Sequence, residues 1–184
     1  MSIIYPSDNL VIMDYNRVVK SLNNLEGPQQ FIDVLRRNYA DIAEYADQSS
    51  VRPSGKGVTS LLIDGTWYEC KVRSDAVEKV VNEHGGSRAV STLDVQVLND
   101  TVLRDILGIE NVRTSSAIDF VGGSRGLEGL TQRCSEDCLA AFCMHPVTIE
   151  ELLDVADAGL NMPPKSTWFE PKPRSGFVVR VFDE

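Results

Sequence analysis

The chain has 184 residues, enough to bury the core of one domain or of two tightly packed lobes. Its 42% hydrophobic and 24% charged residues are typical of a folded globular protein. A net charge of −9 argues against a general nucleic-acid surface, and no apolar run reaches the roughly 18 residues that cross a membrane. The N-terminal residues do not resemble a secretory signal, so we expect a cytoplasmic protein with no nucleic-acid and no membrane partner.

The first predicted element is a strand over residues 9–19, which carries three polar side chains close together. At the two-residue period of a strand, Asp14 and Asn16 share one face and Arg17 lies on the other. Asp14 and Asn16 are candidates for the edge of a site. A solvent-facing side of the strand explains them more simply, and we favour that interpretation.

A β-hairpin over residues 58–72 is the clearest local signal in the chain. Asp64 and Gly65 supply the positive φ values that a type I′ turn requires. Pairing around that turn places Leu61 opposite Tyr68 on one face. The other face carries Ser60 with Glu69 and is predicted to be the solvent side. Leu62 and Trp67 also fall on it, which indicates a covering element or a subunit contact.

Five helices are predicted from apolar residues at helical spacing. The first begins at Pro28, the second covers residues 75–84, the third runs from a Thr92 cap to about Leu107, the fourth contains Leu127 and Leu130, and the fifth covers residues 149–158. Thr148 and Glu151 form a capping box for the fifth helix. We expect the core face of this helix to be Ile149, Leu152, Leu153 and Ala156.

Further strands are predicted over residues 117–121, 138–145 and 176–182. Strands and helices interspersed with a hairpin indicate an α+β protein. We therefore predict a single domain over residues 1–184. Its sheet is mixed or mainly antiparallel, contains a β-hairpin and has about four to five helices packed against it.

The four cysteines do not have the spacing of a zinc site. Cys134, Cys138 and Cys143 read C-x3-C-x4-C, and Cys70 is distant, whereas zinc ribbons use paired C-x2-C units. We expect reduced thiols and no metal site. The sequence identifies no cofactor.

The first candidate for an anion site is the glycine-rich segment at residues 122–126, between a predicted strand and a predicted helix. Backbone N–H groups of such a loop, together with a helix N-terminus, favour a phosphate or carboxylate. Arg125 would add a bidentate donor. The alternative is a tight turn that only needs glycine for its φ values, and we give this alternative more weight.

The second candidate is the segment MPPKSTWFEPK at residues 162–172. Lys165 and Lys172 could hold an anion to which Ser166 and Thr167 donate hydrogen bonds. The upstream glycines of a nucleotide-binding P-loop are absent. In the alternative, the prolines and aromatic residues pin the segment onto the sheet and the lysines stay solvated. No catalytic residue is assigned from the sequence.

A resemblance to a known family rests on three stretches of the sequence. They are VADAGLNMPPKSTWFEPKPRSGFVV at residues 155–179, STLDVQVLNDTVLRDILGI at residues 91–109, and LVIMDYNRVVKSL at residues 10–22. Together they resemble the uncharacterised bacterial family called domain of unknown function 1015. The resemblance covers nearly the whole chain, although the hairpin region matches only in outline.

The resemblance implies a longer full-length protein, of which this chain is the C-terminal part. The preceding half of family members carries a D-G-H-H-R-Y element similar to that of the ParB and sulfiredoxin superfamily, which includes kinases of free serine and nucleotide-binding proteins. This chain contains no such element. The implied partner is therefore the missing N-terminal half.

Two functions follow as expectations. In the first, the chain completes an anion, nucleotide or amino-acid pocket of a serine-kinase-like phosphotransferase and is inactive alone. Arg125, Lys165, Ser166, Thr167 and Lys172 would form that pocket. In the second, the chain is a non-enzymatic module for packing, homodimerisation or partner binding through Trp67, Trp168 and Phe169.

Overall fold

The computed structural model of the chain describes residue 6 and residues 10–49 and 51–172. Its main feature is a six-stranded sheet of order β3-β5-β4-β7-β2-β6, in which all neighbouring strands run antiparallel. The strands are β2 (Tyr15–Val19), β3 (Ala40–Glu44), β4 (Val58–Ile63), β5 (Thr66–Val72), β6 (Ile118–Gly122) and β7 (Ala140–Cys143). The predicted α+β class with an antiparallel sheet and a hairpin is confirmed.

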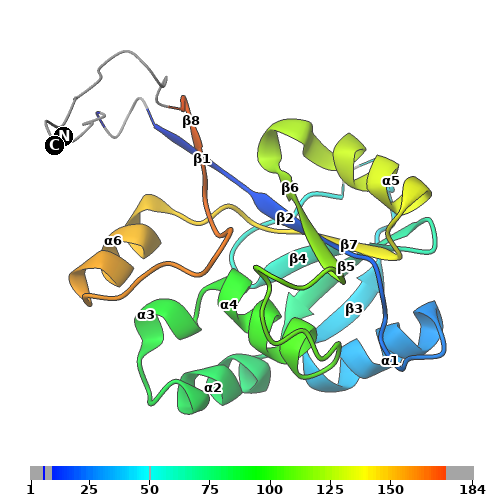
Figure 1. Ribbon diagram of the computed structural model, residues 1–184, viewed down its shortest axis with the longest axis horizontal. Coiled ribbons are helices and arrows are strands. Elements are labelled where there is room, and N and C mark those ends of the chain that lie inside the picture. Colours follow the sequence, from blue (N-terminus) through cyan, green and yellow to red (C-terminus); the bar gives the residue numbers. More distant parts are fainter. Residues whose placement is uncertain (1–5, 7–9, 50, 173–184) are drawn as a thin grey trace, which may run out of the picture.

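Helices cover both faces of this sheet (Figure 1). One face is covered by α5 (Gly126–Glu136), and the other by α1 (Pro28–Asn38), α2 (Ser74–Glu83) and α4 (Asp94–Leu98). The short α3 (Arg88–Ser91) and α6 (Ile149–Asp157) lie beside α4 (Figure 1). Among the described residues, none of these helices is long and apolar enough to cross a membrane.

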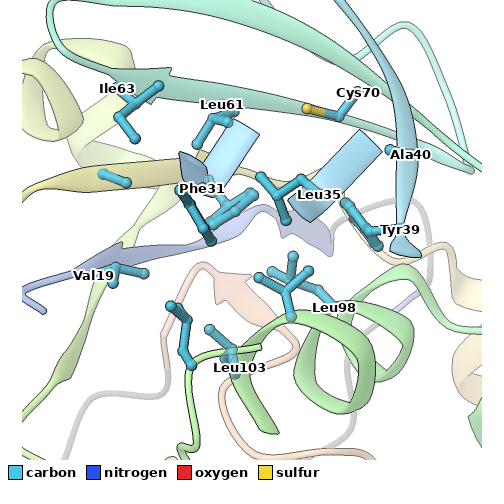
Figure 2. Packing of buried hydrophobic residues seen from close by; sticks show 14 of the residues in the cluster. Val19, Phe31, Leu35, Tyr39, Ala40, Leu61, Ile63, Cys70, Leu98 and Leu103 are labelled. Carbon is cyan, nitrogen blue, oxygen red and sulfur yellow. The ribbon is translucent and has the colours of Figure 1, made fainter. Parts of the chain in front are cut away.

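The larger core lies between the sheet and α1, α2 and α4. Phe31 and Leu35 of α1 pack against sheet residues including Val19 and Leu61 (Figure 2). The rings of Phe31 and Phe142 meet edge-to-face with centroids 6.4 Å apart, an arrangement that aromatic pairs prefer. The helix begins at Pro28, as predicted from the sequence, and its buried residues are Phe31, Ile32 and Leu35.

The hairpin of β4 and β5 has the predicted turn and register, with Leu61 opposite Tyr68. The prediction of its solvent side is wrong. Ser60, Leu62 and Trp67 are all buried, because α5 covers this face with Leu130 and neighbouring apolar residues. The apolar pair Leu62 and Trp67 had indicated a covering element, and α5 is that element.

The predicted single strand over residues 9–19 is two strands. β1 (Val11–Met13) leaves the main sheet and pairs with β8 (Trp168–Glu170), whereas β2 continues into the main sheet after Asp14. The predicted strand over residues 176–182 lies outside the described residues.

The predicted long helix from Thr92 is also interrupted. Thr92 ends α3, Leu93 precedes α4, and the helix then widens into the π-helical turn η2 (Asn99–Arg104). In this turn the N–H of Asp105 donates to the carbonyl of Asp100, five residues back. The wide turn directs the Asp100 carboxylate toward His84, Gln96 and Arg104, all of which hydrogen-bond to it.

The last helix, α6, has the predicted capping box but not the predicted core face. The hydroxyl of Thr148 accepts from the N–H of Glu151, and the Glu151 carboxylate accepts from the N–H of Thr148. Its buried residue is Val155, whereas Leu153 is 53% exposed. The apolar residues of α6 form more than one stripe, so spacing alone did not identify the packed one.

Candidate functional site

Several loops meet at one end of the six-stranded sheet. Because β2 runs antiparallel to both β6 and β7, the start of β2 lies beside the ends of those two strands. The short helix η3 (Gly123–Arg125) follows β6 at this end, and the segment at residues 144–148 follows β7. The proline-containing segment at residues 162–167, which we call the proline segment, returns from α6 across the same end (Figure 1).

Arg17 is the most unusual side chain at this end. It is 1% exposed, and its Nη1 donates to the carbonyl of Tyr15. Its Nε and Nη2 atoms have no hydrogen-bond partner among the described residues. The guanidinium carbon lies 5.7 Å from the centroid of the Phe120 ring. Burial lowers the pKa of Arg17 to about 9, because a charged guanidinium is poorly solvated here.

A small cavity of about 10 Å³ lies beside Arg17. Its lining includes Lys56, Asp94, His145, Glu151 and Ser166. It therefore joins six parts of the chain: β2, the turn before β4, α4, the segment after β7, α6 and the proline segment. Both charge signs are present, so the cavity can bind polar groups of either sign.

Asp94 and Lys56 both line this cavity. Both carboxylate oxygens of Asp94 accept from the N–H of Gly57, at 3.0 and 2.9 Å. Burial nevertheless raises the pKa of Asp94 to about 6. Lys56 Nζ lies 2.5 Å from a carboxylate oxygen of Glu151, so its charge is already balanced.

Asp14 and Asn16 are buried, which makes the favoured solvent-facing interpretation wrong. They hydrogen-bond to each other, and Asn16 Oδ1 accepts from the N–H of Met144 at 2.9 Å. β2 is an inner strand with helices over both faces, so neither of its faces is open to solvent. The alternation itself was correctly predicted, because Asn16 and Arg17 lie on opposite sides of the sheet.

The proline segment and the glycine-rich loop converge at this sheet end. The rings of Trp168 and Tyr15 meet at 5.4 Å, and Lys165 Nζ lies 5.5 Å from the Tyr15 ring centroid. Trp168 also packs closely over Gly122, where an added Cβ would lie 2.4 Å from the indole ring. Glycine at position 122 thus allows the aromatic ring to approach the strand.

The five predicted anion-binding residues occupy different surroundings. Ser166 is buried and lines the cavity beside Arg17, next to the exposed Lys165 and the half-buried Thr167. Lys172 lies over the Trp168 ring, 3.4 Å from its centroid, and pairs with Glu170 at 3.5 Å. Arg125 is exposed at the end of η3.

Arg125 lies on the side of the sheet covered by α5, where a second arginine accompanies it. Nη2 of Arg52 is 3.8 Å from the position that a Cβ would occupy on Gly126. Arg17, Arg52, Arg125 and Lys165 form no ion pair with a carboxylate of the described residues. In the described part of the chain, this sheet end therefore carries four cations that form no ion pair, and the carboxylates of Asp14 and Asp94 lie at the same end.

Sequence reasoning missed Arg17, Asp94 and Lys56 as site residues. Arg17 had one signal, because a charged residue stands directly before the apolar pair Val18 and Val19 in a predicted strand. Asp94 and Lys56 had none. Their proximity depends on the packing of α4 against the turn that precedes β4.

The cysteines and Trp67 contribute nothing to this site. All four cysteines are free thiols, and burial raises the pKa of Cys143 to about 12. Within the described part of the chain, no cluster of three or more His, Cys, Asp or Glu residues could hold a metal ion. Trp67 is only 6% exposed, so in this fold it cannot serve the partner-binding alternative.

These observations define an antiparallel α+β protein with a polar, partly cationic sheet end. The family model described as protein of unknown function (DUF1015) matches residues 1–96, which is more than half of the chain. The chain therefore belongs to this family. No curated protein matches the sequence.

The fold is similar to that of solved kinase structures. A mutant of a free serine kinase in complex with AMP is 12% identical, with a TM-score of 0.51 over 91% of this chain and 57% of the kinase. A free serine kinase in complex with AMP is 13% identical, with a TM-score of 0.50 over 91% of this chain and 56% of the kinase. The chain thus shares their fold and spans just over half of their length.

Proposed function

We propose that this chain provides the anion-binding part of a kinase-like phosphotransferase, at the sheet end where the proline segment and the glycine-rich loop meet. The carrying observation is that four cations at that end, Arg17, Arg52, Arg125 and Lys165, form no ion pair with a described residue. Cations without carboxylate partners attract anionic ligands, most strongly where water is partly excluded. The fold shared with kinase structures in complex with AMP supports phosphate-containing ligands as the class.

The residues would have distinct roles in this proposal. The hydroxyl of Ser166 would donate to the anion inside the cavity, and Lys165 would attract it at the mouth. Thr167 would add a donor from the same segment. Arg125 would act from the other side of the sheet, and Lys172 would first have to leave Glu170. No catalytic residue is assigned to the chain.

The chemical step would depend on the part of the kinases that has no counterpart in this chain. The chain spans 57% of the mutant kinase structure that it matches. We propose that the longer protein transfers a phosphoryl group to a nucleotide, amino acid or related acceptor, and that its N-terminal half is the partner of this chain. Homodimerisation stays a prediction.

The binding part of the proposal is tested by calorimetric titration of the chain with AMP. Lys165→Ala should weaken AMP binding by roughly 3- to 10-fold, because it removes one charged contact of about 1 kcal/mol. The matched control is Lys71→Ala, since Lys71 is an exposed hairpin lysine paired with Glu69 at 3.0 Å. Absence of AMP binding at millimolar concentration, or equal effects of the two variants, would contradict the proposal.

The activity part is tested by phosphoryl-transfer assays of the longer protein. ATP, ADP and pyrophosphate are the donors to compare, with free amino acids as acceptors. We expect transfer by the longer protein and none by this chain alone. Unchanged transfer in the Lys165→Ala form of the longer protein would remove that lysine from the site.

A further inference from the structure

One edge of the Arg17 guanidinium has no hydrogen-bond partner in the described part of the chain. The Nε and Nη2 N–H groups lie on the same edge and point the same way, whereas Nη1 belongs to the opposite side and donates to Tyr15. Nε and Nη2 are the two atoms that have no partner among the described residues. Two parallel N–H groups match two oxygens of one carboxylate or phosphate group.

Other arginines of this protein show what that edge binds. Arg133 donates from Nε and Nη2 to the two oxygens of Asp137, at 2.7 and 3.0 Å. Arg73 does the same with Asp75, at 2.9 and 2.7 Å. Both of these pairs are solvent-accessible, where an empty edge would be hydrated. Arg17 is fully buried. Leaving these two N–H groups without a partner therefore costs more free energy in Arg17 than it would in Arg133 or Arg73.

We propose that Arg17 binds a two-oxygen anionic group of a small ligand, a carboxylate or one edge of a phosphate, through its Nε and Nη2 atoms. The ligand group would enter from the cavity beneath Ser166. This inference deepens the proposed function, since it names the group held at the same sheet end. It does not depend on phosphoryl transfer, and it would hold equally for a protein that only binds its ligand.

The cavity must enlarge to admit such a group. Its present volume of about 10 Å³ is near the lower limit for one water molecule. The proline segment is the wall best suited to move, because Lys165 holds it at this end through a cation–π contact with Tyr15, next to the ring contact that Trp168 of β8 makes with Tyr15. The opposite walls belong to the sheet and to α4.

The other charged groups limit what can bind. Asp94 and Glu151 line the same cavity, and only Glu151 has a cationic partner, in Lys56. A ligand that carries a positive or hydrogen-bond-donating group beside its anion would suit both Arg17 and Asp94. A highly charged polyanion would be repelled by the two carboxylates.

The test is a thermal-shift and NMR titration of this chain with sodium acetate, inorganic phosphate and AMP, against sodium chloride of equal ionic strength. At roughly ten times Kd, the binding anion should raise Tm by about 3–6 °C. Comparing the titrations with acetate and with phosphate shows whether Arg17 binds a carboxylate or a phosphate group. The Nε–H resonance of Arg17 should shift during the titration.

Arg17→Lys should weaken anion binding at least about tenfold, because lysine keeps the charge but loses the paired donors. Arg133→Lys is the matched control and should bind as the parent does. Equal binding by the parent and Arg17→Lys would overturn the proposal. So would an unmoved Arg17 Nε–H signal at saturating anion, a measurement that needs no variant to fold.

The failure of this inference differs from that of the proposed function. Loss of AMP binding in Lys165→Ala together with an unmoved Arg17 signal would leave the kinase-like proposal and remove Arg17 from it. Anion binding at Arg17 without phosphoryl transfer by the longer protein would keep Arg17 as an anion-binding residue and remove the kinase-like activity.

Discussion

Arg17 and Asp94 line one cavity, and burial acts on both in the same physical way. It lowers the pKa of the guanidinium to about 9 and raises that of the carboxyl to about 6, since each charged form is poorly solvated. Neither residue lies in an ion pair with the other. Binding sites often contain buried charged groups that have no ion pair, because such groups lower the stability of the fold but are available to a ligand.

Asp94 should make the stability of the protein depend on pH. Its folded pKa of about 6 lies above the ordinary value of 3.8, so the folded state binds the proton more tightly. The contribution of Asp94 to the free energy of unfolding is therefore fully present below about pH 4, and it is lost as the pH rises through about 6. Asp94→Asn should stabilise the chain by about 2–3 kcal/mol more at pH 7.5 than at pH 4.

Urea unfolding of Asp94→Asn and the parent at both pH values measures this difference. The comparison cancels titrations shared by the two proteins, such as that of Asp137, whose pKa is lowered by Arg133. A constant free-energy difference across the range would show that Asp94 is solvated in the folded protein.

At the scale of elements, the sequence predicted those whose signals are local. The Asp64-Gly65 turn fixed the hairpin register, and Thr148 with Glu151 fixed the start of α6. The solvent side of the hairpin was mispredicted, because α5 reaches it from a distant part of the chain. The candidate site shows the same difference between local and tertiary signals. Ser166 was named as a candidate anion-binding residue from its local sequence, whereas the position of Asp94 in the cavity depends on tertiary packing.

The junction of Gly122 and Trp168 joins two elements that the sequence identified separately. Gly122→Ala should destabilise the chain by about 1–3 kcal/mol and shift the fluorescence of Trp168, because the new Cβ would lie 2.4 Å from the ring. The control is Gly55→Ala, where an added Cβ meets nothing within 4 Å. Equal stability of the two variants would mean that Trp168 of β8 does not pack on β6.

Across the whole molecule, the apolar core is unevenly distributed. The large cluster around Phe31 and Leu35 anchors the sheet and α1. Among the described residues, the core that holds α6 has four buried members, Leu93, Val95, Val147 and Val155, with three partly buried residues against them. Two leucines at and beyond this helix are exposed. Because α6 carries Glu151 and leads into the proline segment, part of the wall of the Arg17 cavity belongs to the less stable part of the fold.

Hydrogen exchange should reveal this difference. Amides of α6 should exchange faster than those of α1, and Val155→Ala should increase exchange mainly in α6. Leu35→Ala should instead lower the global free energy of unfolding by about 2–5 kcal/mol, because Leu35 is fully buried in the large cluster. Equal protection of the two helices in the parent would contradict the uneven distribution.

The π-helical turn at residues 99–104 contains one residue more than an ordinary helical turn, so deleting one residue there would change the helix in a predictable way. Each residue of a helix advances it by about 100°. A deletion within this turn would restore ordinary helical hydrogen bonding and rotate Leu107 and Ile109 away from the interior that they now fill. A one-codon deletion here would therefore relieve a local irregularity at the cost of two buried side chains, so the extra residue of the wide turn is what brings Leu107 and Ile109 to the core.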